Sequence, residues 1–248
     1  MKFDVWMCTF NSEKMLPLIL KRICEVIPVK VINKKFIVDD FSTDNTKRVA
    51  EKLGWQVYPN KEKGLDSAQR YAFSLVEADY CASFEHDLYL SRDWFPLIPK
   101  HVMDLRCDVA QGIRIRDVKG FRELDIYDNN HRVITSADNT FFSMTQGNKE
   151  TLIEHVDKGS CGHLRWYVDK TVCSRHIRGD IGNSLRHDYL ISRAVNREKL
   201  SKPLRCLLNA PLLSLKVFKE TRDISVIILY PLERFMILSG AIAKKVVE

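Results

Sequence analysis

The sequence lacks the motifs that mark several common classes of metal-binding and nucleotide-binding protein. None of its seven cysteines forms a C-x-x-C pair, which argues against a zinc site. No G-x-G-x-x-G follows the first apolar segment, so a Rossmann dehydrogenase is disfavoured. We find no zinc finger, no RNA-recognition motif and no basic stripe with interleaved aromatics, and therefore expect no nucleic-acid partner.

The sequence also shows no signal peptide and no uninterrupted membrane-spanning run. The first residues lead directly into an expected strand, and the scattered cysteines fit a reducing compartment, so we expect a cytoplasmic protein. The most apolar segment, residues 224–243, contains Pro231, Glu233 and Arg234 near its middle, and charges at mid-bilayer are costly. Two interpretations stay open. The C-terminal helices lie in a membrane interface, or they pack on the core or on a second subunit.

Positive charge is concentrated in the last third of the chain. Residues 174–248 hold 14 Lys and Arg against 7 Asp and Glu, whereas the charges of the remaining residues balance. A basic and apolar tail indicates an anionic membrane surface or a phosphate-bearing substrate. The alternative is an ordinary solvated basic face.

Strands alternate with helices over the first 100 residues. Apolar runs predict strands at residues 3–9, 35–38, 55–58 and 80–84. Apolar spacing and capping residues predict helices at about residues 16–27, 44–53 and 66–76. This alternation is typical of an α/β fold with a largely parallel sheet and helices on both faces.

The pattern is looser after residue 103. We expect further strands at residues 109–115, 121–126, 139–144 and 166–173. We also expect a turn at residues 128–130, a short helix at 149–155, and a mainly helical region beyond Gly182.

Carboxylates follow two of the predicted buried strands at the points where those strands end. Asp39 and Asp40 follow the second strand, and Glu85 and Asp87 follow the fourth. In open α/β sheets, ligands bind in the crevice outside the carboxyl ends of the strands. The sequence therefore predicts one acidic site, suited to a divalent metal bound to a nucleotide.

Four motifs in a fixed order carry a family resemblance. They are Thr9-Phe-Asn11, Val38-Asp-Asp-Phe-Ser-Thr-Asp44, Gly64-Leu-Asp-Ser-Ala68 and Glu85-His-Asp87. Over roughly residues 2–105 the chain resembles family 2 glycosyltransferases of the GT-A fold. The resemblance implies a Rossmann-like, mostly parallel central sheet flanked by helices, followed here by a helical, basic and apolar C-terminal extension. Glu85 departs from the family's D-x-D motif, because it stands where the first Asp is usual.

The resemblance implies roles for the polar residues of these motifs. It places Asp87 at the metal, Mn²⁺ or Mg²⁺, with His176 as a further ligand. It assigns recognition of the nucleotide base to the Asp39–Asp40 pair, whose carboxylates accept N–H donors, whereas Asp44 caps the next helix. The full set expected to bind the sugar nucleotide, including one nearby arginine for phosphate, is Thr9, Asn11, Asp39, Asp40, Asp66, Glu85 and Arg178.

The general base is the least defined element. Inverting transfer needs a group that deprotonates the acceptor hydroxyl, and the family supplies an acid from an E-D-like motif. Only a shortened version is present here, in which Asp157 is the first candidate and Glu154 the second. A phosphate acceptor is already anionic and needs no such base. The polar segment 117–136 is expected to be a loop that folds over the acceptor.

The leading hypothesis is a metal-dependent, inverting glycosyltransferase that uses a UDP- or GDP-linked sugar. Its acceptor is a glycan or a lipid-linked precursor, and its location is peripheral on the cytoplasmic face of the membrane. The alternatives are a polyprenyl-phosphate glycosyl synthase and a non-catalytic protein that binds nucleotide sugars. We expect a donor-binding half at residues 1–105, an acceptor-binding half at 106–183 and the helical extension at 184–248, with the oligomeric state left open.

Overall fold

A computed structural model describes residues 2–131, 139–155, 164–194 and 201–247 of the chain. The chain forms two compact units. The first comprises Met1–Arg114 and Ile134–Arg175, and the second comprises Ile115–Val133 and His176–Glu248. Both divisions fall near the ends of strands, so the last residues of two strands of the sheet are counted with the second unit. The three-part division expected from the sequence stays a prediction.

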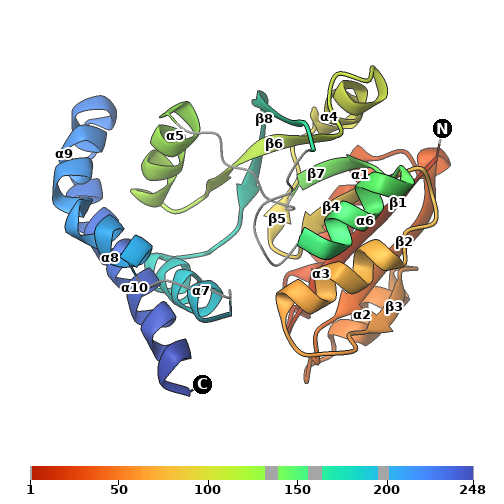
Figure 1. Ribbon diagram of the computed structural model, residues 1–248, viewed down its shortest axis with the longest axis horizontal. Coiled ribbons are helices and arrows are strands. Elements are labelled where there is room, and N and C mark those ends of the chain that lie inside the picture. The colour runs from red at the N-terminus through yellow and green to blue at the C-terminus, as the bar shows by residue number, and fades with distance from the viewer. Residues whose placement is uncertain (1, 132–138, 156–163, 195–200, 248) are drawn as a thin grey trace. The chain divides into compact units, whose positions relative to one another are not determined.

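One mixed sheet organises the first unit (Figure 1). Across the part of the chain that the structure describes, its strand order is β3-β2-β1-β4-β7-β6-β8-β5. The first four strands in this order run parallel, and β7 is antiparallel to both β4 and β6. The strands are β1 Phe3–Thr9, β2 Ile32–Asp39, β3 Gln56–Pro59, β4 Tyr80–Glu85, β5 Leu88–Tyr89, β6 Val109–Arg116, β7 Asn139–Ser143 and β8 Trp166–His176.

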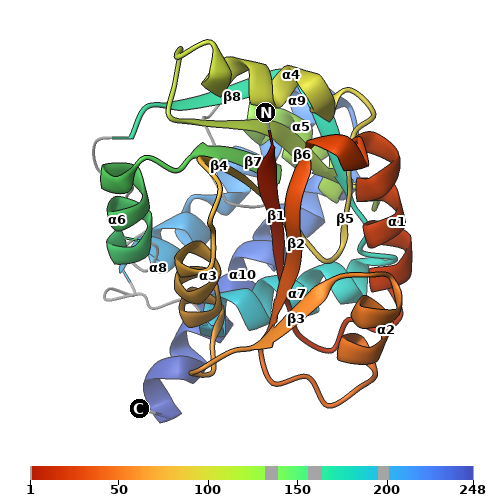
Figure 2. The same cartoon turned by 90° about the vertical axis from the view of Figure 1, so that its right-hand side faces the viewer.

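The central strands are apolar because helices cover both of their faces. Figure 2 shows helices α1 and α2 on one side of β1 and β2, and helices α3 and α6 on the other. Trp6, Phe73 and Phe142 pack edge to face in the core, with ring centroids 5.0 and 5.2 Å apart. The helices of this unit are α1 Leu16–Val26, α2 Thr46–Lys52, α3 Leu65–Ser74, α4 Trp94–Met103 and α6 Gln146–His155. The predicted α/β fold is confirmed.

The second unit is helical, as the sequence predicted beyond Gly182. Helix α10 packs against the other helices of this unit, among them α7 and α9. Its apolar core contains Phe121, Val217 and Val226. The helices are α5 Phe121–His131, α7 Ile181–Ala194, α8 Ser201–Leu208, α9 Ala210–Thr221 and α10 Ser225–Val247.

The predictions for residues 121–130 are wrong. Both the expected strand at 121–126 and the expected turn at 128–130 lie in helix α5, Phe121–His131. Phe121 and Leu124 share the buried face at helical spacing and pack against residues of α9 and α10. The long polar loop expected at residues 117–136 is likewise replaced by this helix from Phe121 to His131, whereas residues 117–120 form bends and a turn.

An ionic network crosses the interior of the second unit. Arg116 contacts Asp125 at 2.7 Å, Glu233 at 2.7 Å and Asp188 at 3.3 Å. Burial raises the pKa of the Glu233 carboxyl, with Asp188 adding to the rise, although Arg116 and Arg234 act to lower it. Removing one partner of such a buried network leaves uncompensated charge in the interior.

One helix of the described residues is long and apolar enough to cross a membrane, at Ser225–Ala243. This stretch contains Glu233 and Arg234, whose Oε2 and Nη2 atoms are 3.3 Å apart. Glu233 is buried within the unit and pairs with Arg116. These charges belong to the protein interior of the second unit, which fits a packed helix better than a lipid-facing one.

The close approach of β6 to β8 requires glycine at position 112. A Cβ atom added to Gly112 would lie 2.6 Å from the Val172 carbonyl oxygen, so the backbone would have to shift. We expect Gly112→Ala to lower the free energy of unfolding by about 1–3 kcal/mol, measured by urea denaturation. Gly147 in α6 is the matched control, because its Cβ would meet nothing within 4 Å. We expect Gly147→Ala to be neutral or to stabilise by up to about 1 kcal/mol. Equal effects of the two substitutions would contradict the packing argument.

Candidate active site

The acidic residues predicted at strand ends meet at one edge of the sheet. Thr9 at the end of β1 is the register partner of Asp39 in β2, and Cys8 is the partner of Glu85 in β4. Because β1, β2 and β4 are parallel, their carboxyl ends lie side by side. The sequence therefore placed these side chains at the correct edge.

Asp39 is held by the loop that follows β2. Its Oδ1 accepts hydrogen bonds from the Ser42 hydroxyl at 2.5 Å and the Thr9 hydroxyl at 3.2 Å, and its Oδ2 accepts one from the Ser42 amide at 3.1 Å. Asn11 connects the same loop to the end of β1, because its Oδ1 accepts from the Thr43 amide at 2.9 Å. The first two motifs therefore form one hydrogen-bonded rim.

Asp40 turns toward a different loop, the one between β3 and α3. The Gly64 amide donates to both of its carboxylate oxygens, at 2.9 and 3.1 Å. Gly64 has φ of +129°, in the region where glycine is favoured, so this approach depends on the residue type. Asn60 adds a hydrogen bond from its Nδ2 to Asp40 at 2.8 Å.

Sequence reasoning missed Asn60. This side chain is buried and, besides Asp40, contacts the Glu62 carbonyl, so it braces the loop that presents Gly64. The sequence could have indicated this role, since Asn60 is the first polar residue after β3 and lies at the same sheet edge as the acids. The signal was weak because a lone Asn after a strand is typical of an ordinary turn.

Asp44 accepts a hydrogen bond from the first amide of helix α2, although the residue at the N-cap position is Asn45. Its Oδ1 accepts hydrogen bonds from the amide of Thr46, the first residue of α2, at 2.9 Å and from the Thr46 hydroxyl. Burial acts to raise the pKa of Asp44, but these hydrogen bonds and one from the Glu13 amide hold it below its ordinary value. Asp44 therefore supports the rim from outside the site.

Two carboxylates at this edge act on the thiol of Cys8. Burial raises the pKa of the Cys8 thiol, and the charges of Asp40 and Glu85 raise it further. Asp40 and Glu85 therefore act on one point from the ends of the two strands that flank β1. Such a site favours a bound cation.

Glu85, Asp87 and His176 form a group suited to a metal ion. Each offers a ligand atom, and these atoms lie within 4.8 Å of one another. Glu85 ends β4, Asp87 follows it, and His176 is the last residue of β8, next to Arg175 in the same sheet. Asp87 and His176 are 7% and 5% exposed, so both are positioned by the fold. Two carboxylates and one imidazole fit Mn²⁺, which accepts both oxygen and nitrogen ligands.

Two arginines stand next to this group. Arg114 in β6 lies 4.0 Å from Glu85. Arg178 lies beside His176, with its Nη2 3.2 Å from the imidazole Nδ1. A guanidinium only donates hydrogen bonds, so Nδ1 is the acceptor in this contact.

The remaining predicted residues lie in different settings. Asp66 is in the first turn of α3 and half-buried. Glu154 is exposed in the last turn of α6. Asp157 lies outside the described residues. The roles proposed for these three residues stay predictions.

The family assignment follows from comparison with known proteins. The model of glycosyl transferase family 2 matches residues 4–170, and the chain therefore belongs to this family. It is a glycosyltransferase with the GT-A fold, as the resemblance implied. Comparison with curated protein sequences found no match.

Solved structures with the same fold contain nucleotide sugars or nucleotides. A mannosyltransferase from Pyrobaculum calidifontis with GDP-Man and Mn²⁺ has a TM-score of 0.66 and 15% identity, over 99% of this chain and 88% of that one. Glucosyl-3-phosphoglycerate synthase from Mycobacterium tuberculosis with Mn²⁺ and UDP has a TM-score of 0.52 and 13% identity, covering 79% and 81%. S. aureus TarS 1-349 with UDP-GlcNAc has a TM-score of 0.53 and 13% identity, covering 100% and 91%.

The group of Glu85, Asp87 and His176, called the metal-binding group below, predicts that the protein binds Mn²⁺ in the absence of a nucleotide. We expect Asp87→Asn to weaken Mn²⁺ binding more than about tenfold in calorimetric titration, because it removes a charged ligand from a buried position. Asp93→Asn, which removes the same charge from an exposed residue of the first unit, should leave the affinity unchanged. His176→Ala tests the imidazole separately. Equal affinities of wild type, Asp87→Asn and Asp93→Asn would show that the metal binds elsewhere.

Proposed function

We propose that this glycosyltransferase is metal-dependent and inverting, and that it transfers a sugar from a UDP- or GDP-linked donor to a glycan or lipid-linked acceptor. The observation that carries the proposal is the group of Glu85, Asp87 and His176 at the same sheet edge as Asp39 and Asp40. A nucleoside diphosphate needs a partner for its base and a cation for its phosphates, and this edge offers both kinds of group.

Different residues bind the base and the diphosphate of the donor. Asp39 and Asp40 accept hydrogen bonds from the base, with Thr9, Asn11 and the rim loops fixing their orientation. Glu85, Asp87 and His176 hold Mn²⁺ or Mg²⁺, which supplies charge neutralisation at the leaving diphosphate when bound. Arg114 and Arg178 stand close enough to this group to contact phosphate oxygens.

Acceptor activation is assigned to a carboxylate of the segment after β7. Asp157 is our first choice for the general base and Glu154 the second. Inversion follows from a single displacement, in which the acceptor oxygen attacks the anomeric carbon as the nucleoside diphosphate leaves. A polyprenyl-phosphate acceptor would not need the base, since its oxygen is already ionised.

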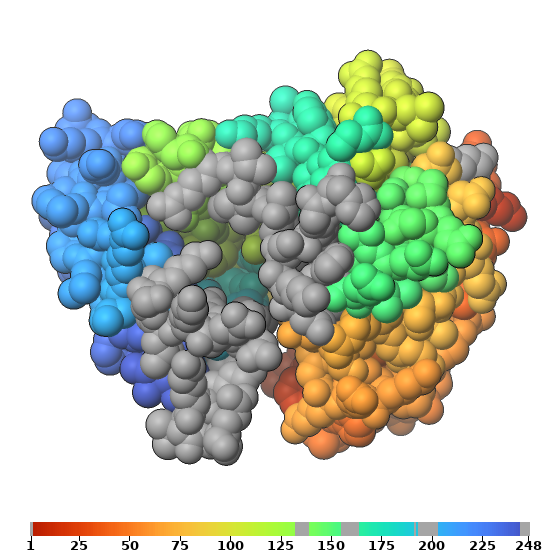
Figure 3. Space-filling view, in the orientation of Figure 1, coloured from red at the N-terminus to blue at the C-terminus, as the bar shows by residue number. Residues whose placement is uncertain are grey.

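The surface of the C-terminal helices supports a lipid-linked acceptor. Two rows of apolar side chains are exposed at helical spacing, namely Leu204, Leu208, Leu212 and Leu215, and Ile224, Ile228, Leu232 and Phe235. Helices α8 and α9, which carry the first row, form part of the outer surface in blue in Figure 3. Exposed Arg205, Lys216 and Lys219 lie among them. Apolar rows flanked by cations fit a membrane interface with anionic lipids, so we propose peripheral attachment there.

Nucleotide titration tests the donor site. We expect either UDP or GDP to bind in a Mn²⁺-dependent manner, and Asp87→Ala to abolish that dependence, because Asp87 would hold the metal that would neutralise the diphosphate. The matching sugar nucleotide, incubated with a polyprenyl phosphate or glycan acceptor, should yield a product of inverted anomeric configuration by NMR. Binding without turnover for every acceptor would favour a non-catalytic sugar-nucleotide-binding protein. Failure of both nucleotides to bind would refute the proposal.

Vesicle flotation tests the membrane contact. We expect the protein to bind vesicles containing phosphatidylglycerol, and Leu208→Ser/Leu212→Ser to weaken binding about tenfold or more, because both side chains leave the interface. Val29→Ser/Leu105→Ser is the matched control, since these residues are 74% and 76% exposed in the first unit. If the Leu208→Ser/Leu212→Ser protein floats like the control but changes its oligomeric mass, the surface is a subunit interface instead.

A further inference from the structure

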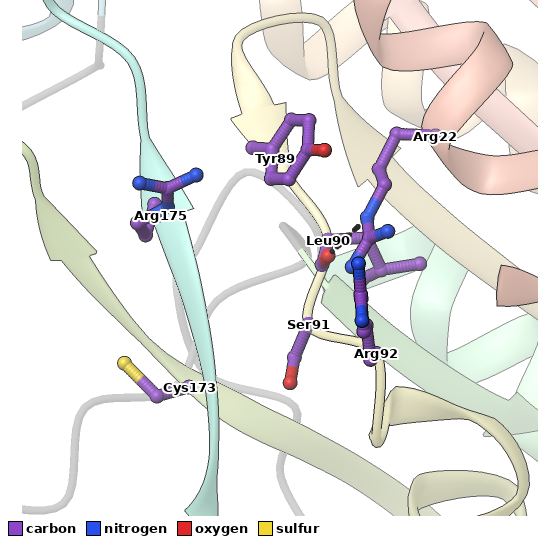
Figure 4. A pocket seen from close by; sticks show the side chains of 7 residues that line it. All are labelled: Arg22, Tyr89, Leu90, Ser91, Arg92, Cys173 and Arg175. Atoms are coloured by element: carbon purple, nitrogen blue, oxygen red, sulfur yellow. Dashed lines mark hydrogen bonds between the residues drawn. The ribbon is translucent and has the colours of Figure 1, made fainter. Parts of the chain in front are cut away.

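A basic pocket lies in the first unit, apart from the groups assigned above. It has a volume of about 350 Å³, within the range of small-ligand sites. Its walls come from α1, from β5 and the segment after it, and from β8 (Figure 4). The lining residues are Arg22, Tyr89, Leu90, Ser91, Arg92, Cys173 and Arg175.

Arg22 is the fixed part of this pocket. It is only 7% exposed, and its Nε donates a hydrogen bond to the Leu90 carbonyl at 2.8 Å, drawn in Figure 4. Its Nη1 lies 3.3 Å from Glu25, whose side chain is 46% exposed. Nη2 has no hydrogen-bond partner among the described residues. Because burial and the Leu90 hydrogen bond fix the guanidinium of Arg22, its Nη2 atom keeps a set orientation and can donate to a ligand.

Tyr89 arranges a second arginine opposite the first. The guanidinium of Arg22 lies 4.7 Å from the ring centroid of Tyr89, and that of Arg175 lies 5.1 Å from it. Figure 4 shows the ring between these two side chains. Contact with the aromatic face holds each cation in place without neutralising its charge.

The pocket has an excess of positive charge. Three of its lining residues are arginines, and no carboxylate is among the described residues that line it. Only Arg22 has an ion-pair partner, Glu25, whereas Arg92 and Arg175 form no ion pair within the described part of the chain. Guanidinium groups that line a concave space can bind phosphate through charge-assisted hydrogen bonds. The Ser91 hydroxyl adds a neutral donor.

We propose that this pocket is a second anion site, which binds the phosphate group of a ligand other than the sugar donor. It is separate from the metal-binding group, although the two share strands. Consecutive side chains of a strand point to opposite faces, so Arg175 and His176 lie on opposite faces of β8. Tyr89 likewise follows Asp87 at a distance of only two residues along the chain. A ligand bound here contacts β5, next to Asp87, and β8, which ends at His176.

Anion titration tests the pocket with the full-length protein in EDTA, so that no metal bridges the anion. We expect pyrophosphate or inorganic phosphate to bind at one saturable site. Arg92→Gln/Arg175→Gln should weaken this binding about tenfold or more, because two charge-assisted contacts are lost while buried Arg22 is kept. Arg48→Gln/Lys52→Gln on the exposed face of α2 removes the same charge and should leave the affinity unchanged.

A second arm identifies the source of the phosphate. The same proteins are mixed with phosphatidylglycerol vesicles and with phosphatidylcholine vesicles. Binding of free anions identifies a soluble phosphate ester. Binding only to phosphatidylglycerol, lost in the pocket variant and kept in the control, identifies a lipid headgroup. The proposal is overturned if wild type binds neither probe, or if the pocket variant and the control behave alike in both arms.

Nucleotide binding by the pocket variant distinguishes this pocket from the proposed donor site. We expect Arg92→Gln/Arg175→Gln to retain Mn²⁺-dependent nucleotide binding, since neither arginine belongs to the metal-binding group. Loss of nucleotide binding together with anion binding would show that the pocket is part of the donor site and would overturn the claim of a second site. Anion binding without any nucleotide binding would refute only the proposed function.

Discussion

The crowding of carboxylates at one sheet edge is the constraint on which the site depends. Asp39, Asp40, Glu85 and Asp87 follow parallel strands, and their mutual repulsion must be offset. Asp39 and Asp40 are stabilised by hydroxyl and amide donors of adjacent loops. Glu85 and Asp87 instead stand with His176 in an arrangement that suits a cation. The two pairs therefore differ in chemistry although they share an edge.

The backbone supports this division at particular positions. Gly64 allows the loop before α3 to approach Asp40, and Gly112 allows β6 to approach β8, whose last residue is His176. No ligand-binding role is assigned to Asn60 or Asp44, yet their hydrogen bonds fix the loops that carry Asp39 and Asp40. Substitutions at such positions act on the site through its geometry, as expected where function needs several strand ends in register.

The second unit combines a buried ionic network with an apolar exterior. Arg116, Glu233 and their partners occupy the interior, whereas leucine and isoleucine rows face outward. The interior also holds the apolar core around Phe121, so the unit departs from the usual arrangement only at these positions. An outward apolar row gains stability only when something covers it, which is the reason for proposing a membrane contact there.

The sequence by itself determined the alternation of strands and helices, the edge at which the acids gather and the family, because these depend on periodicity and on residues close together along the chain. It failed at α5, where a short apolar pattern fits strand or helix and packing against α9 and α10 decides. Tertiary structure alone brought His176 to Asp87 and placed both Arg22 and Arg175 against the Tyr89 ring. Those meetings join residues far apart in sequence, and no local preference encodes them.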